Sequence, residues 1–274
     1  MRDEATAIRS RWLDELTEWI PEVLAKWHLS LHHVFDNASC AWVASVVRSD
    51  GTRAVLKFGM PHMEGAHEID GLRFWNGDAI VLLLEDDVKR NAMLLESCEP
   101  GLPLSTLPEP EQDEVLAKLL ARLWRTPLES HPFRPLSAMT DYWTEETMAS
   151  RSQWLDHGLT MAGLELFSEL SRPSSSDVVL TTDLHAGNIL RAQREPWLVI
   201  DPKPFVGDRA YDATQHLMNC KERLLRDPEA TIACVAGLLD IDEERVRLWM
   251  FARSAAEPRD EWTHASLRIA RALS

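Results

Sequence analysis

The first part of the chain combines one long helical pattern with several strand-like ones. Apolar residues recur at helical spacing over residues 5–27, with a break or kink expected at Pro21. Alternating, β-branched runs then predict four strands, over residues 41–47, 53–58, 80–84 and 92–96. Residues 62–76 have a helical pattern between them. This part is therefore predicted to be an antiparallel sheet with helices.

The rest of the chain is predicted to be mostly helical. Residues 109–126 carry a leucine-rich apolar stripe, with acidic residues in the first turn and arginines in the last, which suits the helix dipole. Further helices are expected over residues 142–155, 159–170, 228–239 and 242–256. The Pro-Gly-Leu-Pro segment at residues 100–103 breaks the composition. Two domains are therefore expected, at residues 1–98 and 99–274.

Composition restricts the class of partner. The chain has 274 residues, 45% of them hydrophobic, which is enough for two lobes with a sizeable core. Its formal net charge of −15 argues against a nucleic-acid partner, which would need a basic face. An acidic surface suits a cationic small molecule through electrostatic steering. The same charge would also simply keep the protein soluble, and charge alone does not choose between these readings.

The cysteines and the apolar runs indicate the cellular compartment. Four cysteines stand singly, without a C-x-x-C pair, so a zinc site is not expected and a reducing cytoplasm is favoured (Cys40, Cys98, Cys220 and Cys234). The first residues have no apolar signal-peptide core, and no apolar run is long enough to cross a bilayer. We therefore expect a cytoplasmic protein without a membrane partner, as a monomer or weak dimer.

The stretch Leu180–Pro202 carries the strongest chemical pattern. Asp183 lies in a short loop, Asn188 follows it, and an apolar strand ends abruptly at Asp201 before Pro202. Two loops joined by a hairpin would bring these three side chains together. Phosphoryl transfer needs an oxygen base near the attacking hydroxyl and hard oxygen ligands for Mg²⁺. Asp183 would be the base, with Asn188 and Asp201 as metal ligands, a spacing that resembles the kinase catalytic loop.

The motifs DLHAGNIL and IDPKPFVGDRAYDATQ resemble the aminoglycoside phosphotransferase family, especially its streptomycin and hydroxyurea kinase branch. The similarity is strong over roughly Leu180–Cys220 and weaker through the first half. It implies an α+β, bilobal protein-kinase-like fold with a nucleotide-binding first lobe and a catalytic, substrate-binding second lobe. It also implies a phosphotransferase that uses ATP and Mg²⁺ to modify a hydroxyl of a streptomycin-like aminoglycoside, and hence antibiotic resistance.

The resemblance also implies nucleotide-binding residues in the first lobe. Lys57, on a V-L-K strand, corresponds to the lysine that pairs with phosphate, although alone it would read as a solvated strand lysine. Glu68 would hold it, with Glu64 one turn earlier as a rival. Ser39 would cover the phosphates in a loop without glycine. The backbone of Glu96 and Cys98 would meet the purine edge.

The chain departs from the family at Thr181-Thr182, where the family has His-Gly; two β-branched residues stiffen a turn in which glycine would allow unusual φ and ψ angles. His185 is expected to brace the catalytic loop, and Asp212 to cap or anchor the helix that follows. Late acidic residues could bind the ammonium or guanidinium groups of a substrate, or could equally be a solvated cluster (Glu257, Asp260 and Glu261).

Two alternative functions remain open at this point. A metabolic kinase of the same fold would act on hydroxyurea or an amino alcohol. A nucleotide-binding protein that has lost catalysis would account for Thr181-Thr182 and for the loop without glycine. The presence of Asp183, Asn188 and Asp201 counts against the second alternative, since no binding module needs all three.

Overall fold

The computed structural model describes residues 2–36, 40–258 and 264–274. The chain divides into two compact units. The first contains Met1–Leu102 and Leu190–Ile200, and the second contains Pro103–Ile189 and Asp201–Ser274. This division differs from the single boundary expected after residue 98, because a short segment from the second half of the sequence belongs to the first unit.

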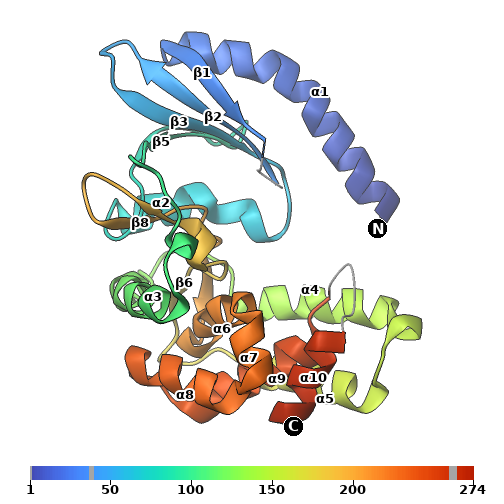
Figure 1. Ribbon diagram of the computed structural model, residues 1–274. Coiled ribbons are helices and arrows are strands. Elements are labelled where there is room, and N and C mark those ends of the chain that lie inside the picture. Colours follow the sequence, from blue (N-terminus) through green and yellow to red (C-terminus); the bar gives the residue numbers. More distant parts are fainter. Residues whose placement is uncertain (1, 37–39, 259–263) are drawn as a thin grey trace. The chain divides into compact units, whose positions relative to one another are not determined.

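The first unit is built on a five-stranded antiparallel sheet with strand order β1-β2-β3-β5-β4 (Figure 1). Its strands are β1 (Leu29–Phe35), β2 (Ala41–Arg48), β3 (Arg53–Gly59), β4 (Leu83–Asp87) and β5 (Ala92–Glu96). Strands β2, β3 and β5 lie where the pattern predicted them. The pattern missed β1, an edge strand whose side chains beyond Leu29 are mostly exposed.

The fourth strand begins later than predicted. Ile80 and Val81 are buried and extended, as their sequence indicated, but they pair with Val199 instead of with β5. The strand β4 therefore covers Leu83–Asp87, and the apolar residues before it belong to a separate contact. The strand predicted over residues 80–84 therefore differs from the structure in its bounds and in the partner of its first residues.

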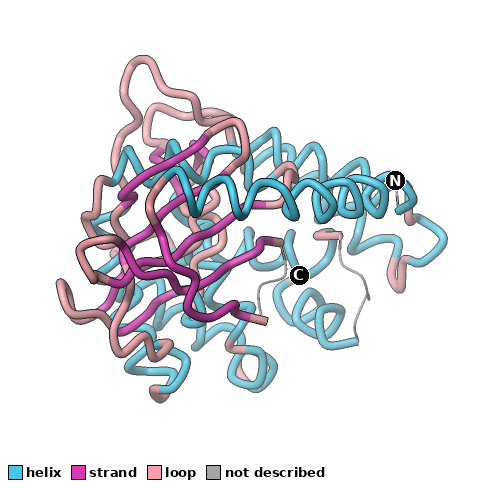
Figure 2. Tube along the Cα trace, turned by 90° about the horizontal axis from the view of Figure 1, so that it is seen from above, coloured by secondary structure: helices cyan, strands magenta, loops and turns pink. Residues whose placement is uncertain are grey.

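Helix α1 (Arg2–Lys26) lies across the sheet of the first unit (Figure 2). Its side chains Trp12, Leu16 and Val23 are buried against residues of the sheet. Burying each such side chain is worth about 1.5–3 kcal/mol, whereas an interior proline costs about 3 kcal/mol. This balance explains why the helix continues through Pro21 without the expected break, whereas the alternative expectation of a kink stays a prediction.

A hairpin of β7 (Ile189–Arg191) and β8 (Trp197–Val199) brings the inserted segment into the first unit. Arg194 in its turn fastens it there. The guanidinium donates to both carboxylate oxygens of Glu96, with Nε at 2.9 and 3.2 Å, and also to the carbonyl oxygens of Gly77 and Ile80 at 2.7 and 2.8 Å. Such a forked set of charge-assisted hydrogen bonds fixes both the distance and the orientation of the guanidinium relative to its partners.

The second unit is mostly helical. Its longer helices are α3 (Glu109–Leu123), α4 (Leu136–Ala149), α5 (His157–Leu170), α6 (Arg209–Asn219), α7 (Lys221–Arg226), α8 (Pro228–Leu239), α9 (Glu243–Ala256) and α10 (His264–Leu273). A two-stranded antiparallel pair, β6 (Val178–Leu180) and β9 (Phe205–Gly207), carries the loop that contains Asp183. Aspartates cap α5, α6, α8 and α9 by accepting backbone N–H bonds.

Aromatic rings form the centre of the second unit. Trp143, Phe167, Tyr211 and Trp249 pack in a connected cluster from α4, α5, α6 and α9. Their ring centroids lie 5.2–6.4 Å apart, within the range of favourable aromatic pairs. This cluster gives α6 and α9 a fixed mutual position, which matters for the site below. Among the residues that the structure describes, no helix combines the length and apolar character that crossing a membrane requires.

Candidate active site

The loop after β6 is held by one buried carboxylate. Asp212 is fully buried and accepts from the backbone N–H groups of Thr181 and Thr182, at 3.0 and 2.8 Å. The indole N–H of Trp124 also donates to it, at 3.0 Å. Burial raises the pKa of Asp212, and these hydrogen bonds oppose that rise. The buried carboxylate therefore fixes the path of the loop that leads to Asp183.

Asp212 does not cap the helix, which corrects one part of the sequence-based expectation. It lies inside α6, and the N-cap is Asp208, whose carboxylate accepts from the N–H of Ala210 at 3.0 Å. The anchoring role holds, but it acts on the Thr181-Thr182 backbone. A helical residue can reach that backbone because α6 and β6 contact each other.

Thr182 takes the strained backbone conformation that glycine would have taken. Its φ is +48°, in the left-handed region that β-branched residues avoid, at a cost of about 1–3 kcal/mol. Its hydroxyl donates to the carbonyl oxygen of Lys203 at 2.6 Å, and its N–H bonds Asp212. These bonds offset the strain, so the loop forms with Thr181-Thr182 in place of His-Gly.

Asp183 is held at both carboxylate oxygens. Gln215 donates to Oδ1 at 2.8 Å, and the ammonium of Lys203 lies 2.5 Å from Oδ2. The Asp183 side chain remains 21% exposed, so it can be reached from solvent. Each oxygen of a carboxylate has two lone pairs, so both can still accept another hydrogen bond.

Asn188 is oriented by the same loop. Its side-chain N–H donates to the backbone carbonyl of Asp183 at 3.0 Å. Because that partner is an acceptor, the amide nitrogen must face it, and the amide oxygen is turned the other way. That oxygen is the atom a divalent cation would use.

Asp201 follows β8 with φ of +54°, a conformation that aspartate tolerates better than most residues. Two residues later, the N–H of Lys203 donates to the carbonyl oxygen of Thr181 at 2.9 Å, so the segment that carries Asp201 runs beside the loop of Asp183. Burial lowers the pKa of His185, and the charges of Asp183 and Asp201 oppose this effect. His185 also accepts from the N–H of Gly187 at 3.1 Å, the bracing role expected for it. The oxygens of Asn188 and Asp201 fit the hard ligands that Mg²⁺ prefers.

The first unit contains a buried ion pair on its central strand. Lys57 lies on β3, between Val43 of β2 and Met93 of β5, and its ammonium is 2.6 Å from Oε1 of Glu68. Glu68 is the first residue of α2 (Glu68–Trp75). The two residues are 7% and 5% exposed, which excludes the reading of Lys57 as a solvated strand lysine. Of the two glutamates considered from the sequence, the structure places Glu68 on the lysine.

Glu96 and Cys98, whose backbone is expected to meet the purine edge, also have defined side-chain environments. The Glu96 carboxylate accepts from Arg194 and from the N–H of Leu82 at 3.0 Å. Burial raises the pKa of Cys98 to about 11, so the thiol is neutral at physiological pH. Neither fact concerns the backbone groups, so the purine contacts of these two residues stay a prediction.

Glu257 has a different environment from the one expected for a substrate carboxylate. Arg253 donates to both of its oxygens, at 2.7 and 3.2 Å, which neutralises much of its charge. Its binding of a substrate cation stays a prediction. The other two late acids, Asp260 and Glu261, and the phosphate-loop residue Ser39 lie outside the described residues.

Sequence reasoning missed two residues of this site, Lys203 and Gln215. Both lie within motifs that were recognised, IDPKP and YDATQ, but they are 20 and 32 positions from Asp183. Their position as polar residues inside recognised motifs was the available signal. Nothing in local spacing says that their side chains turn toward Asp183, because tertiary packing sets that direction.

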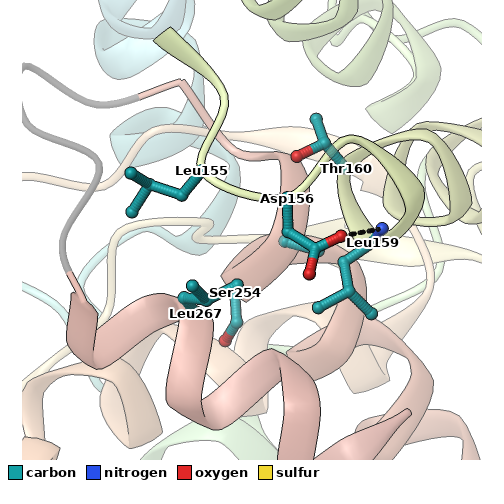
Figure 3. Close-up of a pocket in the computed structure, with 7 residues that line it drawn as sticks. Leu155, Asp156, Leu159, Thr160, Ser254 and Leu267 are labelled. Carbon is teal, nitrogen blue, oxygen red and sulfur yellow. Dashed lines mark hydrogen bonds between the residues drawn. The ribbon is translucent and has the colours of Figure 1, made fainter.

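A small cavity in the second unit lies between α5, α9 and α10 (Figure 3). Its volume is ≈ 10 Å³, room for about one water molecule. The hydroxyl of Ser254 in its lining is buried, with no hydrogen-bond partner among the described residues. A single water would satisfy that hydroxyl, and the space is too small for a substrate.

A buried polar cluster links α3 to α6 and α7. Asp113 accepts from His216 at 2.7 Å and from Arg223 at 2.6 Å, and the Cys220 thiol lies 3.5 Å from the His216 ring nitrogen. Three of these side chains have the spacing of metal ligands. However, the Arg223 charge already lies on Asp113, and burial raises the pKa of Cys220 to about 12. We interpret this cluster as a structural network.

Comparison with known proteins assigns the family. Residues 26–260 match the family described as aminoglycoside/hydroxyurea antibiotic resistance kinase. The chain belongs to this family. It is therefore a small-molecule kinase, an enzyme that phosphorylates hydroxyl groups, as the motifs had indicated.

Individual relatives agree with this assignment. The chain is similar to streptomycin 6-kinase of Streptomyces glaucescens, with 32% identity over 255 residues, 88% of this chain and 81% of that protein. It is also 33% identical to hydroxyurea phosphotransferase of Kitasatospora aureofaciens, over 87% of this chain and 72% of that protein. The structure of choline kinase from Cryptosporidium parvum Iowa II shares the fold, with a TM-score of 0.61, 14% identity and 94% of each chain covered. The α+β, kinase-like fold expected from the sequence is thus confirmed.

Proposed function

We propose that this kinase transfers the γ-phosphate of ATP to a hydroxyl of a streptomycin-like aminoglycoside, with Asp183 as the base. The observation that carries the proposal is the geometry of Asp183. Its carboxylate is held at both oxygens and partly exposed, and its backbone carbonyl orients Asn188. The 32% identity to streptomycin 6-kinase supports the acceptor class.

The chemical step assigns a role to each side chain of the second unit. The acceptor hydroxyl oxygen forms a bond to the γ-phosphorus, the bond to the bridging oxygen breaks, and ADP leaves. The hydroxyl proton passes to Asp183. Lys203, which contacts Oδ2 of Asp183, would place a positive charge beside the phosphoryl group during its transfer.

Asn188 and Asp201 would hold Mg²⁺, which would neutralise phosphate charge when bound. In the first unit, Lys57 would pair with phosphate oxygens, and Glu68 would hold its ammonium in place. Ser39 and the backbone of Glu96 and Cys98 remain proposed nucleotide contacts. The net charge of −15 favours a cationic acceptor.

A hydroxyurea acceptor is the second candidate, because a hydroxyurea phosphotransferase is 33% identical to this chain. An ADP-release assay over streptomycin, hydroxyurea and an amino alcohol distinguishes the candidates. Release with streptomycin alone supports the proposal. Release with hydroxyurea or the amino alcohol, and none with streptomycin, would replace it by a metabolic kinase.

Replacing the proposed base tests the catalytic assignment. Asp183→Asn keeps the shape of the side chain but removes its proton-accepting charge, so we expect turnover to fall by about 10²- to 10⁴-fold. ATP binding, measured by calorimetry, should persist. The exposed Asp141→Asn, the same chemical change elsewhere in the second unit, should leave turnover unchanged. Near-wild-type turnover in Asp183→Asn would remove Asp183 from the mechanism.

A further inference from the structure

Gln215 lies between two side chains of opposite hydrogen-bonding character. On one side, Arg253 donates to its Oε1 at 2.6 Å. On the other, its Nε2 donates to Oδ1 of Asp183 at 2.8 Å. A guanidinium has only donors and a carboxylate has only acceptors, so they cannot both bond the same end of the amide.

These neighbours fix which way the amide points. Its oxygen must face Arg253, because Arg253 offers no acceptor, and its nitrogen must then face Asp183. The orientation of a glutamine amide is usually ambiguous, but here the chemistry of the two partners decides it. Gln215 thereby links the guanidinium of Arg253 to the carboxylate of Asp183, accepting from the first and donating to the second. It also keeps the two charges apart by the length of one side chain.

Arg253 is itself fixed on every side. It is 3% exposed, and it bonds Thr214 at 2.8 Å and Glu257 at 2.7 Å. The ring centroids of Tyr211 and Trp143 lie 4.7 and 5.8 Å from its guanidinium carbon. A buried charge is costly unless it is fully paired, and these contacts supply that pairing. The fixed guanidinium gives Gln215 a rigid support.

We propose that Arg253, acting through Gln215, is a positioning residue that holds the Asp183 carboxylate in the orientation for proton transfer. This inference rests on the proposed role of Asp183 as the base. The chain of contacts begins at Glu257, the C-cap of α9, and runs through Arg253 to Gln215 on α6. From Gln215 it continues to Asp183. It also assigns Glu257 to the support of Arg253 and not to a substrate cation.

The decisive variant is Gln215→Glu. Its carboxylate still accepts from Arg253, so the buried arginine stays paired and the fold should be kept. It offers no donor to Asp183 and places a like charge beside it. We expect kcat to fall by about 10- to 100-fold, with KM for ATP within about twofold and an unchanged melting temperature. The same change at the exposed Gln153 should alter none of these values.

A double-mutant cycle tests whether Arg253 acts through Gln215. Gln215→Met removes the donor at similar volume, and Arg253→Met removes the support. If the path is serial, the double variant has the kcat of Gln215→Met alone. Additive losses would overturn the serial path. Arg253→Lys should restore little activity, because an ammonium lacks the planar fork that bonds Thr214, Gln215 and Glu257 together.

The outcomes separate this inference from the proposed function. If Asp183→Asn is inactive and Gln215→Glu keeps wild-type kcat, the base stands and the positioning role fails. If Asp183→Asn is active, the base itself is wrong. If Gln215→Glu raises only KM for the acceptor, Gln215 contacts the substrate, which also overturns the positioning role. A Glu257→Gln variant that raises KM for a cationic acceptor alone would return Glu257 to substrate binding.

Discussion

The two lysine–carboxylate pairs of the enzyme have nearly the same length, but one is buried and the other is partly exposed. Lys57 and Glu68 in the first unit lie 2.6 Å apart, with side chains 8% and 5% exposed. Lys203 and Asp183 in the second unit lie 2.5 Å apart, with side chains 18% and 21% exposed. Distance alone therefore does not distinguish them, whereas access to solvent does.

The difference in exposure agrees with the different tasks that we propose for the two carboxylates. A sealed carboxylate can hold an ammonium in place, because water does not compete for it and the local dielectric is low. A carboxylate that receives a proton from a substrate, the role proposed for Asp183, needs an open side, and Asp183 is 21% exposed. We infer that the buried carboxylate positions another residue, and that the partly exposed carboxylate is the one that reacts.

Opening the sealed pair should have the largest effect on stability. Lys57→Met removes the ammonium that lies on a buried carboxylate, so we expect a loss of about 3–5 kcal/mol of unfolding free energy, measured by chemical denaturation. Lys118→Met, at an exposed lysine 3.9 Å from Glu114, should change stability by less than about 0.5 kcal/mol.

A double variant sharpens that result. Lys57→Met combined with Glu68→Leu replaces both charges by apolar groups, which should recover most of the lost stability. Phosphotransfer should stay impaired, because the ammonium proposed for the phosphates is absent. If the double variant is no more stable than Lys57→Met, the Lys57–Glu68 pair is not the source of the loss.

A third carboxylate, that of the buried Asp113, allows the effect of burial to be tested by changing the pH. Burial alone would raise its pKa, but hydrogen bonds from His216 and Arg223 hold the pKa below its ordinary value. The ionised form thus stabilises the fold above the unfolded-state pKa of about 3.9. That contribution is lost as pH falls through the lower, folded-state pKa.

Asp113→Asn should therefore cost about 2 kcal/mol at neutral pH, less than for Lys57→Met because Arg223 is partly exposed. The difference in stability between this variant and the wild type should become smaller as the pH is lowered below about 4. Thermal melts from pH 3 to 7 measure it. A gap that stays constant with pH would mean that the charge of Asp113 makes no contribution.

Removing Lys203 from the partly exposed pair should have the smallest effect on stability. Lys203→Met removes a partner from a carboxylate that water can reach and that Gln215 still bonds, so the loss should be below about 1 kcal/mol. Its kcat should nevertheless fall, because the positive charge proposed to act beside the transferring phosphoryl group is lost. A large loss of stability here would contradict the difference drawn between the two pairs.

The sequence predicted what depends on local pattern. The strands β2, β3 and β5, the helical second unit and the loop with Asp183 follow from periodicity and motif spacing. The pattern left Glu64 and Glu68 open, since they lie one turn apart, and only tertiary structure places Glu68 on Lys57.

Contacts between distant segments were beyond the sequence. Lys203, Gln215 and Arg253 converge on Asp183 from a loop and two helices, and no local period encodes the direction of their side chains. The sequence did predict that Thr182 stiffens its turn. It did not predict the hydrogen bonds from the Thr182 hydroxyl and N–H, which stabilise the strained backbone angle.

The inserted segment Leu190–Ile200 restricts how this enzyme can be recombined with its relatives. The polypeptide passes between the units three times, after residues 102, 189 and 200. A chimera that exchanges the first unit must therefore graft two pieces of sequence. Its inner junctions fall next to Asn188 and Asp201, so both residues must come from the parent that donates the second unit. A hybrid joined only near residue 102 would combine the hairpin of one parent with the sheet of the other.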